Sequence, residues 1–564
     1  QWLAGDLYRP RSATAQTPAP LVVVVPGFQR SKEALSNIAL ELARRGVVVI
    51  SIDPYAQGNS SASESRRSAT TEGYGLFAVI EYAANTNLLN YVDKTRIGAT
   101  GHSAGGNAVV LAARRFGRQA ARAKEPSKLH SAFVSGYLMA FTAENLRGVR
   151  SNMGASYALY DEGAYRNEFK NADLRRSPEA LRFVNTASGD GFTPVEEVEP
   201  GRYYGDEKER GLRVIHNEPL LHPLQPYSPR ETAHQLEFFE RAFGLEWALK
   251  STDQVWFWKE VCTALCLIAA FLSLVPLARL LVESVAWFRP LQHPLPPPQP
   301  RQGSRAVFWT LLTIGAVIAC VSYIPMAELS QKLFVEASSR DQTWFFPQRM
   351  NNAVMLWALL NGAVGFGLFA IGCRLGRAHG VTREMLGIDI TAAELGRTVV
   401  LAGGLFASFF LLLFVVYYFF HVDFRFLFFG ARVFQPATMG LLLMYAPLFL
   451  PFFLQNSFRV NGAMRRDGVP EWRSMLLAGF ANSAGLLLIL IVQYVCLAVT
   501  GTVYWTDGWL YINLLFAVVP MMFVLPYFNR YFFRLTGRVY LGPLTTCPIF
   551  IMMLVANTVC YLPF

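Results

Sequence analysis

Charged residues are scarce in this chain, and its first 261 residues contain no cysteine. Only 16% of the 564 residues are charged, whereas soluble domains carry roughly 25% charge. All seven cysteines lie at position 262 or beyond, so disulfide bonds cannot support the N-terminal region. The cysteine and histidine residues also lack the spacing of a metal site. These shortages exclude a disulfide-rich scaffold, and we expect neither a metal nor another cofactor.

Acidic residues are outnumbered, and the formal net charge is +11. This excess does not indicate nucleic-acid binding, because many of the arginines lie in short connections between apolar segments. Positive charge in such connections is typical of the cytoplasmic loops of membrane proteins. We therefore expect no nucleic-acid partner and a chain that is partly dissolved in lipid.

Hydrophobicity divides the chain into two regions. Single hydrophobic cores stop growing at roughly 250 to 300 residues, and long apolar runs begin here at about residue 261 and recur to the C-terminus. One run, 398–420, has 23 residues without a charge and would span roughly 30 Å as a helix. We expect one domain over 1–245 and an all-α membrane domain of about eight transmembrane helices over 246–564. The predicted spans are about 259–282, 306–326, 351–373, 398–421, 435–457, 474–500, 509–528 and 541–562.

The connections between these spans predict the orientation. Alternate connections carry 15 Lys and Arg residues on one side and 5 on the other. Because Lys and Arg are enriched in cytoplasmic loops, we expect an integral protein of a bacterial inner or plasma membrane with residues 1–245 outside the cytoplasm. Nothing in those residues would translocate them, so we expect an upstream signal or anchoring helix. At the outer end of the fourth span, His421, Asp423 and Arg425 are expected to form a solvated ion cluster.

The first domain alternates β-branched runs with helical patterns. Strands are predicted over 21–25 and 47–53, each followed by a loop and an amphipathic helix, and a further strand over 96–103 leads into another helix. Buried strands that alternate with helices form a parallel sheet with both faces covered. The sequence therefore predicts an α/β fold with a doubly wound, mostly parallel sheet.

A G-x-S-x-G motif lies between a predicted strand and a predicted helix. Gly101 and Gly105 flank the central Ser103, and small flanking residues permit the sharp turn that exposes a nucleophilic serine. The backbone amide of Ala104, at the helix N-terminus, is placed to donate to a developing oxyanion. The motif alone is weak, and the strand–turn–helix context supports it.

These features resemble the α/β-hydrolase superfamily over roughly residues 3–245. The residues Pro26, Gly27 and Phe28 occupy the position of the oxyanion loop, which makes the chain most similar to dienelactone hydrolases and polyester hydrolases. The resemblance implies that the backbone amide of Phe28 is the second oxyanion donor. It also implies a serine, acid and histidine in that chain order.

Two aspartates compete for the role of the acid. Asp161 lies at the C-terminal end of the segment 151–162, which is the better predicted strand, and Asp190 lies in a flexible Gly-Asp-Gly sequence. Asp161 is the first choice because it keeps the strands and the crossover short. Asp190 is the alternative, and Glu162 is a third candidate.

The histidine is expected in the loop before the last helix of the domain. His222 lies in that loop, whereas His216 lies within the preceding strand, His234 lies on the helix, and His102 is expected to pack beneath the serine. The predicted triad is therefore Ser103, His222 and Asp161, in which the histidine takes the serine proton and the aspartate orients the imidazole.

The leading hypothesis is a membrane-bound serine esterase or lipase that cleaves a lipid or another hydrophobic ester. Membrane lipids are the expected partners, and the sequence does not predict an oligomeric state. Two alternatives remain open. One is an acyltransferase that uses the same triad, and the other is a transporter or receptor whose hydrolase-like head only binds a ligand.

Overall fold

The N-terminal domain is built on an eight-stranded, mostly parallel sheet in the computed structural model, which describes residues 1–300, 305–433 and 435–563. Arg301, one of the 15 charges counted above, lies outside the described residues. The strand order is β1-β3-β2-β4-β5-β6-β8-β7, and β1 and β7 run antiparallel to their neighbours. This sheet confirms the predicted fold class. The strands are β1 Gly5–Tyr8, β2 Ala19–Val25, β3 Val48–Ile52, β4 Val92–His102, β5 Ser131–Ser135, β6 Asn152–Tyr160, β7 Tyr203–Tyr204 and β8 Arg213–Leu221.

Helices cover both faces of this sheet, which explains the continuous apolar character of β2. Val22 and Val24 pack on the side of α1 and α7, whereas Val23 and Val25 pack on the side of α3 and α4. Alternate residues of a strand point to opposite faces, so a strand covered on both faces needs an uninterrupted apolar run. The helices of this domain are α1 Ser36–Arg44, α2 Ser68–Thr71, α3 Leu76–Asn85, α4 Ala104–Ala123, α5 Ala143–Leu146, α6 Pro178–Val184 and α7 Pro229–Ala242.

The C-terminal half is helical, and seven of its helices are long and apolar enough to cross a membrane. They are Trp256–Ser284 (α8), Arg305–Leu333 (α9), Arg349–Arg377 (α11), Ala392–Phe420 (α12), Pro436–Ala463 (α13 and the turn after it), Glu471–Thr500 (α14) and Trp509–Thr536 (α15 Trp509–Asn513 and α16 Leu515–Thr536). A short helix, α10 Val335–Ser339, follows α9.

The segment predicted as an eighth span, 541–562, is helical only over Leu541–Ala556 (α17), which is 16 residues. About 20 residues are needed to span the hydrocarbon core, so the sequence overestimated the length of this helix.

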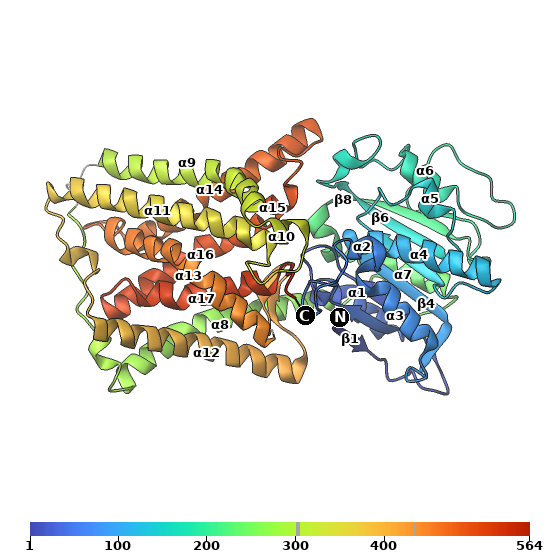
Figure 1. The fold of residues 1–564 in the computed structure, drawn as a ribbon, viewed down its shortest axis with the longest axis horizontal. Coiled ribbons are helices and arrows are strands. Elements are labelled where there is room, and N and C mark those ends of the chain that lie inside the picture. Colours follow the sequence, from blue (N-terminus) through green and yellow to red (C-terminus); the bar gives the residue numbers. More distant parts are fainter. Residues whose placement is uncertain (301–304, 434, 564) are drawn as a thin grey trace.

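The chain leaves α17 to contact the N-terminal domain. The backbone N–H of Cys560 donates to the carbonyl of Ala56 at 2.7 Å. Figure 1 shows the sheet domain beside one end of the helical domain, with both chain termini at the junction. The loops of the helical domain that face the sheet domain are the ones that carry few Lys and Arg residues. In one of these loops, the side chain of Gln342 donates to the carbonyl of Ser63 at 3.1 Å.

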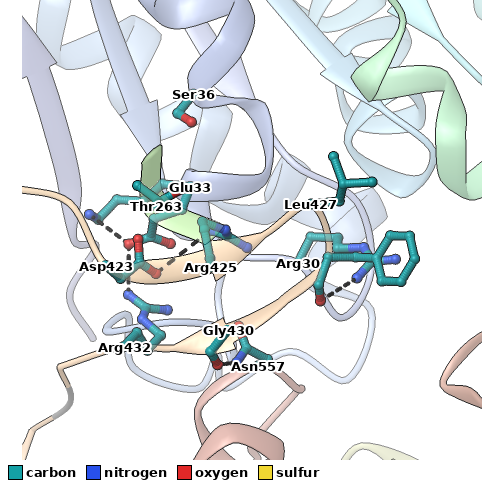
Figure 2. A network of polar contacts seen from close by, with 12 residues as sticks. Arg30, Glu33, Ser36, Thr263, Asp423, Arg425, Leu427, Gly430, Arg432 and Asn557 are labelled. Atoms are coloured by element: carbon teal, nitrogen blue, oxygen red, sulfur yellow. Dashed lines mark hydrogen bonds and ion pairs between the residues drawn. The ribbon is translucent and has the colours of Figure 1, made fainter. Parts of the chain in front are cut away.

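A small hairpin between α12 and α13 fastens the two domains together. Its strands are β9 Phe424–Phe426 and β10 Phe429–Ala431. Arg432, which follows the hairpin, pairs with Glu33 at 3.1 Å (Figure 2). It also pairs with Asp53 at 3.5 Å, and the side chains of Arg432, Glu33 and Asp53 are only 3%, 10% and 0% exposed. Next to them, Arg425 lies 3.7 Å from Asp423.

The predicted solvated cluster is therefore wrong for Asp423 and Arg425, whose side chains are only 5% and 3% exposed. The correction has a structural cause. The first α/β unit of the N-terminal domain lies over the end of the fourth span, a contact between segments nearly 400 residues apart that no local sequence pattern indicates.

Candidate active site

Ser103 lies in a strained turn between β4 and α4. Its φ and ψ are 56° and −123°, a conformation that residues with side chains rarely adopt. The flanking glycines permit it. A Cβ at Gly105 would lie 2.1 Å from the carbonyl oxygen of Val25, and one at Gly101 would lie 2.6 Å from the backbone of Gly105. The close packing of α4 against the end of β2 thus requires both glycines.

The sheet register brings the other two predicted residues together. Tyr160 at the end of β6 pairs with Leu221 at the end of β8, so Asp161 and His222 follow directly at the same edge. Parallel strands bring their carboxyl ends to one edge of a sheet, which is where functional sites of such folds lie.

The three side chains form a hydrogen-bonded line. His222 Nε2 lies 2.8 Å from Ser103 Oγ, and His222 Nδ1 lies 2.6 Å from Asp161 Oδ2. The other oxygen of Asp161 accepts the N–H of Gly163 at 2.7 Å, which fixes the carboxylate. Both Asp161 and His222 are buried. The structure therefore places the predicted nucleophile, base and acid within direct hydrogen-bonding distance.

The remaining candidates lie elsewhere. Asp190 is exposed in the loop after α6. His216 stacks on His234 with ring centroids 3.8 Å apart. His102 is buried beside the candidate base, with its ring centroid 4.6 Å from that of His222. The geometry thus favours Asp161 over the rival aspartate, and it places none of the other three histidines opposite the serine hydroxyl.

Glu162 does not contact the imidazole ring; it binds the backbone of His222 and a residue of the helical domain, contacts that the sequence did not predict. Its Oε2 accepts the backbone N–H of His222 at 2.9 Å, and its Oε1 accepts the hydroxyl of Tyr494 on α14 at 2.6 Å. A second residue from the helical domain, Trp509, meets the His222 ring edge-on at 5.4 Å. Neither contact has a local sequence signal, because each joins segments more than 280 residues apart.

Burial and neighbouring charges set the protonation of the site. Burial favours neutral His222, but the Asp161 carboxylate and its hydrogen bond favour the imidazolium more strongly, so the pKa of His222 is raised above its usual value. Burial, and then the charge of Asp161, raise the pKa of Glu162 to about 7. Burial and the neighbouring His222 lower the pKa of His102 well below its usual value.

The proposed oxyanion donors lie on two sides of the serine. Ala104 is the first residue of α4 and follows the nucleophile directly. The loop that carries Phe28 packs against the turn, since a Cβ at Gly27 would lie 2.9 Å from the Cβ of Ser103. Among the described residues, no group of three or more His, Cys, Asp and Glu side chains is placed to hold a metal ion.

Ser103 and His222 open into a cavity between the two domains, which we call the interdomain cavity. It encloses about 1010 Å³, including space open to solvent. Its walls come from the oxyanion loop, the two candidate catalytic residues, the β9–β10 hairpin and helices of the C-terminal half. The lining residues used below are Phe28, Arg30, Ser103, His222, Tyr227, Leu510, Asn513, Leu514, Ala517, Met521, Met553, Leu554 and Asn557.

Comparisons with known proteins identify a family model and several similar solved structures. Residues 2–175 match the family model described as PET hydrolase-like. Similar solved structures are Est1E from Butyrivibrio proteoclasticus with bound ferulic acid (18% identity, 28% of this chain and 76% of that chain, TM-score 0.23), the alpha/beta hydrolase GrgF from Penicillium sp. sh18 (13%, 43% and 95%, 0.29) and Thermogutta terrifontis esterase 2 (13%, 44% and 92%, 0.30). The chain carries a PETase-like α/β-hydrolase domain followed by seven long apolar helices.

Proposed function

We propose that this chain, with its PETase-like domain and seven apolar helices, is a membrane-bound serine hydrolase that cleaves esters of lipids or other hydrophobic molecules. The observation that carries the proposal is the hydrogen-bonded line from Asp161 through His222 to Ser103. A buried carboxylate, an imidazole and a serine hydroxyl in this order are the parts needed for acyl transfer through a covalent intermediate.

The mechanism follows from the contacts of the two ring nitrogens of His222. Nε2 of His222 takes the proton of Ser103 as Oγ attacks the ester carbonyl carbon, and Asp161 holds the proton on Nδ1 and stabilises the imidazolium. The carbonyl oxygen becomes an oxyanion that accepts hydrogen bonds from the amides of Phe28 and Ala104. One such donor contributes roughly 10²- to 10³-fold to kcat.

Collapse of this intermediate breaks the bond between the carbonyl carbon and the alcohol oxygen. The alcohol leaves with the proton from His222, and Ser103 keeps the acyl group. A water molecule then gives a proton to Nε2 and attacks the acyl-enzyme, and the same proton returns to Ser103 when the carboxylic acid is released. No group beyond these residues is needed to balance the reaction.

The strained serine turn supports the same proposal. The backbone of Ser103 is held at positive φ by packing that requires Gly101 and Gly105. Strain of this kind persists where a site depends on it, and the turn here presents Oγ to His222 and to the interdomain cavity.

Ester hydrolysis by the purified, detergent-solubilised chain tests the proposal. We expect p-nitrophenyl butyrate to be cleaved and Ser103→Ala to reduce kcat/KM at least 10³-fold. The matched control is Ser188→Ala, which changes a serine in an exposed loop of the same domain and should leave kcat/KM unchanged. Hydrolysis that persists in Ser103→Ala would overturn the assignment.

A further inference from the structure

The wall of the interdomain cavity opposite the sheet domain belongs to the helical domain, and an apolar stripe runs along it beside the amides of Asn513 and Asn557. Leu510, Leu514, Ala517 and Met521 of the apolar span Trp509–Thr536 line it, at intervals of four, three and four residues. This spacing places them on one face of a helix. Met553 and Leu554 of α17 complete this wall. Helices of the membrane domain thus form a stripe of hydrocarbon opposite the candidate nucleophile.

A second cavity lies behind this wall in the helical domain and encloses about 350 Å³, including space open to solvent. Met521 and Leu554 line both cavities, so these two side chains stand between the two spaces. Only apolar residues line the second cavity, and they come from α11, α13, α16 and α17: Val354, Trp357, Ala358, Phe449, Phe452, Phe453, Val518, Met521, Met522, Phe550, Ile551 and Leu554. Methionine side chains are flexible and adapt to irregular ligands.

We propose that the substrate is a long-chain acyl ester whose acyl chain lies inside the membrane domain. The ester carbonyl lies at Ser103, the first carbons lie along Leu514 and Ala517, and the tail passes Met521 and Leu554 into the second cavity. This inference rests on the proposed function and names its substrate class. The helices that line this path are then part of the hydrolase site as well as of its anchor.

The side chains that line the two cavities indicate how the ester is oriented, with its alcohol portion in one cavity and its acyl chain in the other. Cavities lined only by hydrocarbon stay dry, so they suit an alkyl chain and exclude a polar alcohol group. The polar side chains Arg30, Tyr227, Asn513 and Asn557 lie on the interdomain cavity and not on the second one. We therefore place the alcohol portion, such as a lipid headgroup, on the side of Arg30 and the acyl chain on the side of Met521.

A chain-length series tests this arrangement. For the wild-type chain, kcat/KM for p-nitrophenyl esters should rise from acetate to dodecanoate. Each methylene buried against the apolar wall should raise kcat/KM by a factor of about four at most.

Ala517→Phe places a ring in the proposed path of the acyl chain. This variant should lower the ratio of kcat/KM for dodecanoate to kcat/KM for acetate at least 30-fold. The control is Val524→Phe, on the same helix but 42% exposed on the outside of the helical domain, which should leave this ratio unchanged.

The outcomes separate the inference from the proposed function. An unchanged dodecanoate-to-acetate ratio in an active Ala517→Phe variant overturns the acyl-chain path and leaves the serine hydrolase intact. Hydrolysis that does not depend on Ser103 overturns the proposed function itself.

A second measurement uses the unaltered chain and does not depend on the folding of a variant. A fluorophosphonate with a hexadecyl chain and a terminal diazirine would attach to Ser103 and, on illumination, crosslink to whatever surrounds the chain end. We expect crosslinked peptides from α11, α13, α16 or α17. Crosslinks to the sheet domain or to detergent alone would overturn the path, and absence of attachment at Ser103 would contradict the proposed function.

Discussion

At the scale of residues, His222 lies between two carboxyl groups from one turn after β6. Asp161 contacts its ring, whereas Glu162 contacts its backbone N–H. Of these two contacts, only the one with Nδ1 fixes the tautomer in which Nε2 can accept the serine proton. The two adjacent acids therefore have different roles: Asp161 orients the imidazole of His222, and Glu162 fixes the backbone of the loop that carries it.

Replacing the two rival aspartates distinguishes their roles. Asp161→Asn should reduce kcat for p-nitrophenyl butyrate by roughly 10⁴-fold, because the amide favours the wrong imidazole tautomer. Asp190→Asn changes an exposed loop residue in the same way and should leave kcat unchanged. Equal losses in both variants, or a loss only in Asp190→Asn, would contradict the geometry.

Tyr494 couples a membrane helix to the pH dependence of the site. Its hydroxyl stabilises the Glu162 carboxylate, and that charge in turn raises the pKa of His222. In Tyr494→Phe the pKa of Glu162 rises above about 7, fewer molecules carry the charge near neutral pH, and the pKa of His222 falls. Since the base must be neutral, the acid limb of the kcat/KM profile should move to lower pH. An acid limb at the wild-type position would show that α14 has no influence on the base.

Some of these residues were predictable from sequence and others were not. Ser103 follows from a motif in its strand–turn–helix context, and Asp161 and His222 follow from the ends of predicted strands. Tyr494 and Trp509 could not be predicted, because their contacts with the site depend on how the two domains pack against each other. A local sequence pattern predicts which face of a helix is apolar, but it does not predict which distant side chain that face contacts.

At the scale of elements, the β9–β10 hairpin is the clearest difference between expectation and structure. Its charged residues were expected in solvent, because charges at the end of a membrane span usually lie there. In the structure Asp423 and Arg425 are buried beside the sheet domain and pair with each other, and Arg432 pairs with the sheet-domain acid Glu33. The β2 and β3 strands, by contrast, are readable from sequence because each is almost entirely apolar.

Removal of the buried arginine should loosen the junction. Arg432→Gln leaves Glu33 and Asp53 buried and short of one positive charge, a change that costs on the order of 3 kcal/mol when a buried pair is broken. We expect a lower Tm in detergent. Arg383→Gln is the control, because it removes an exposed arginine whose partner Asp389 is also exposed, and exposed pairs contribute about 1 kcal/mol or less. Equal Tm values for the two variants would mean that the junction does not depend on this ion pair.

At the scale of the whole molecule, the charge asymmetry agrees with the domain arrangement. The connections with five Lys and Arg residues include the loops that contact the sheet domain, through Gln342 and Arg432 for example. The charge-rich connections, as far as the structure describes them, lie at the other end of the helices. The sheet domain is therefore expected on the side opposite the cytoplasm.

Cysteine labelling tests this orientation. The sheet domain has no native cysteine, so Leu88→Cys, at a side chain that is 77% exposed, introduces one new site there. A membrane-impermeant maleimide should label this variant in intact cells above the background of the parent chain. Arg383→Cys, in a connection of the charge-rich side, should be labelled only after the cells are permeabilised. The reverse pattern would contradict the orientation.

Labelling by a fluorophosphonate probe, read by mass spectrometry of the modified peptide, tests the central claim most directly. The probe reacts with a serine only when a neighbouring base has activated it. We expect a single modification at Ser103 in the solubilised chain, and its loss in His222→Ala. Absence of modification on a folded chain, or modification at another residue, would contradict the assignment of Ser103 as the nucleophile.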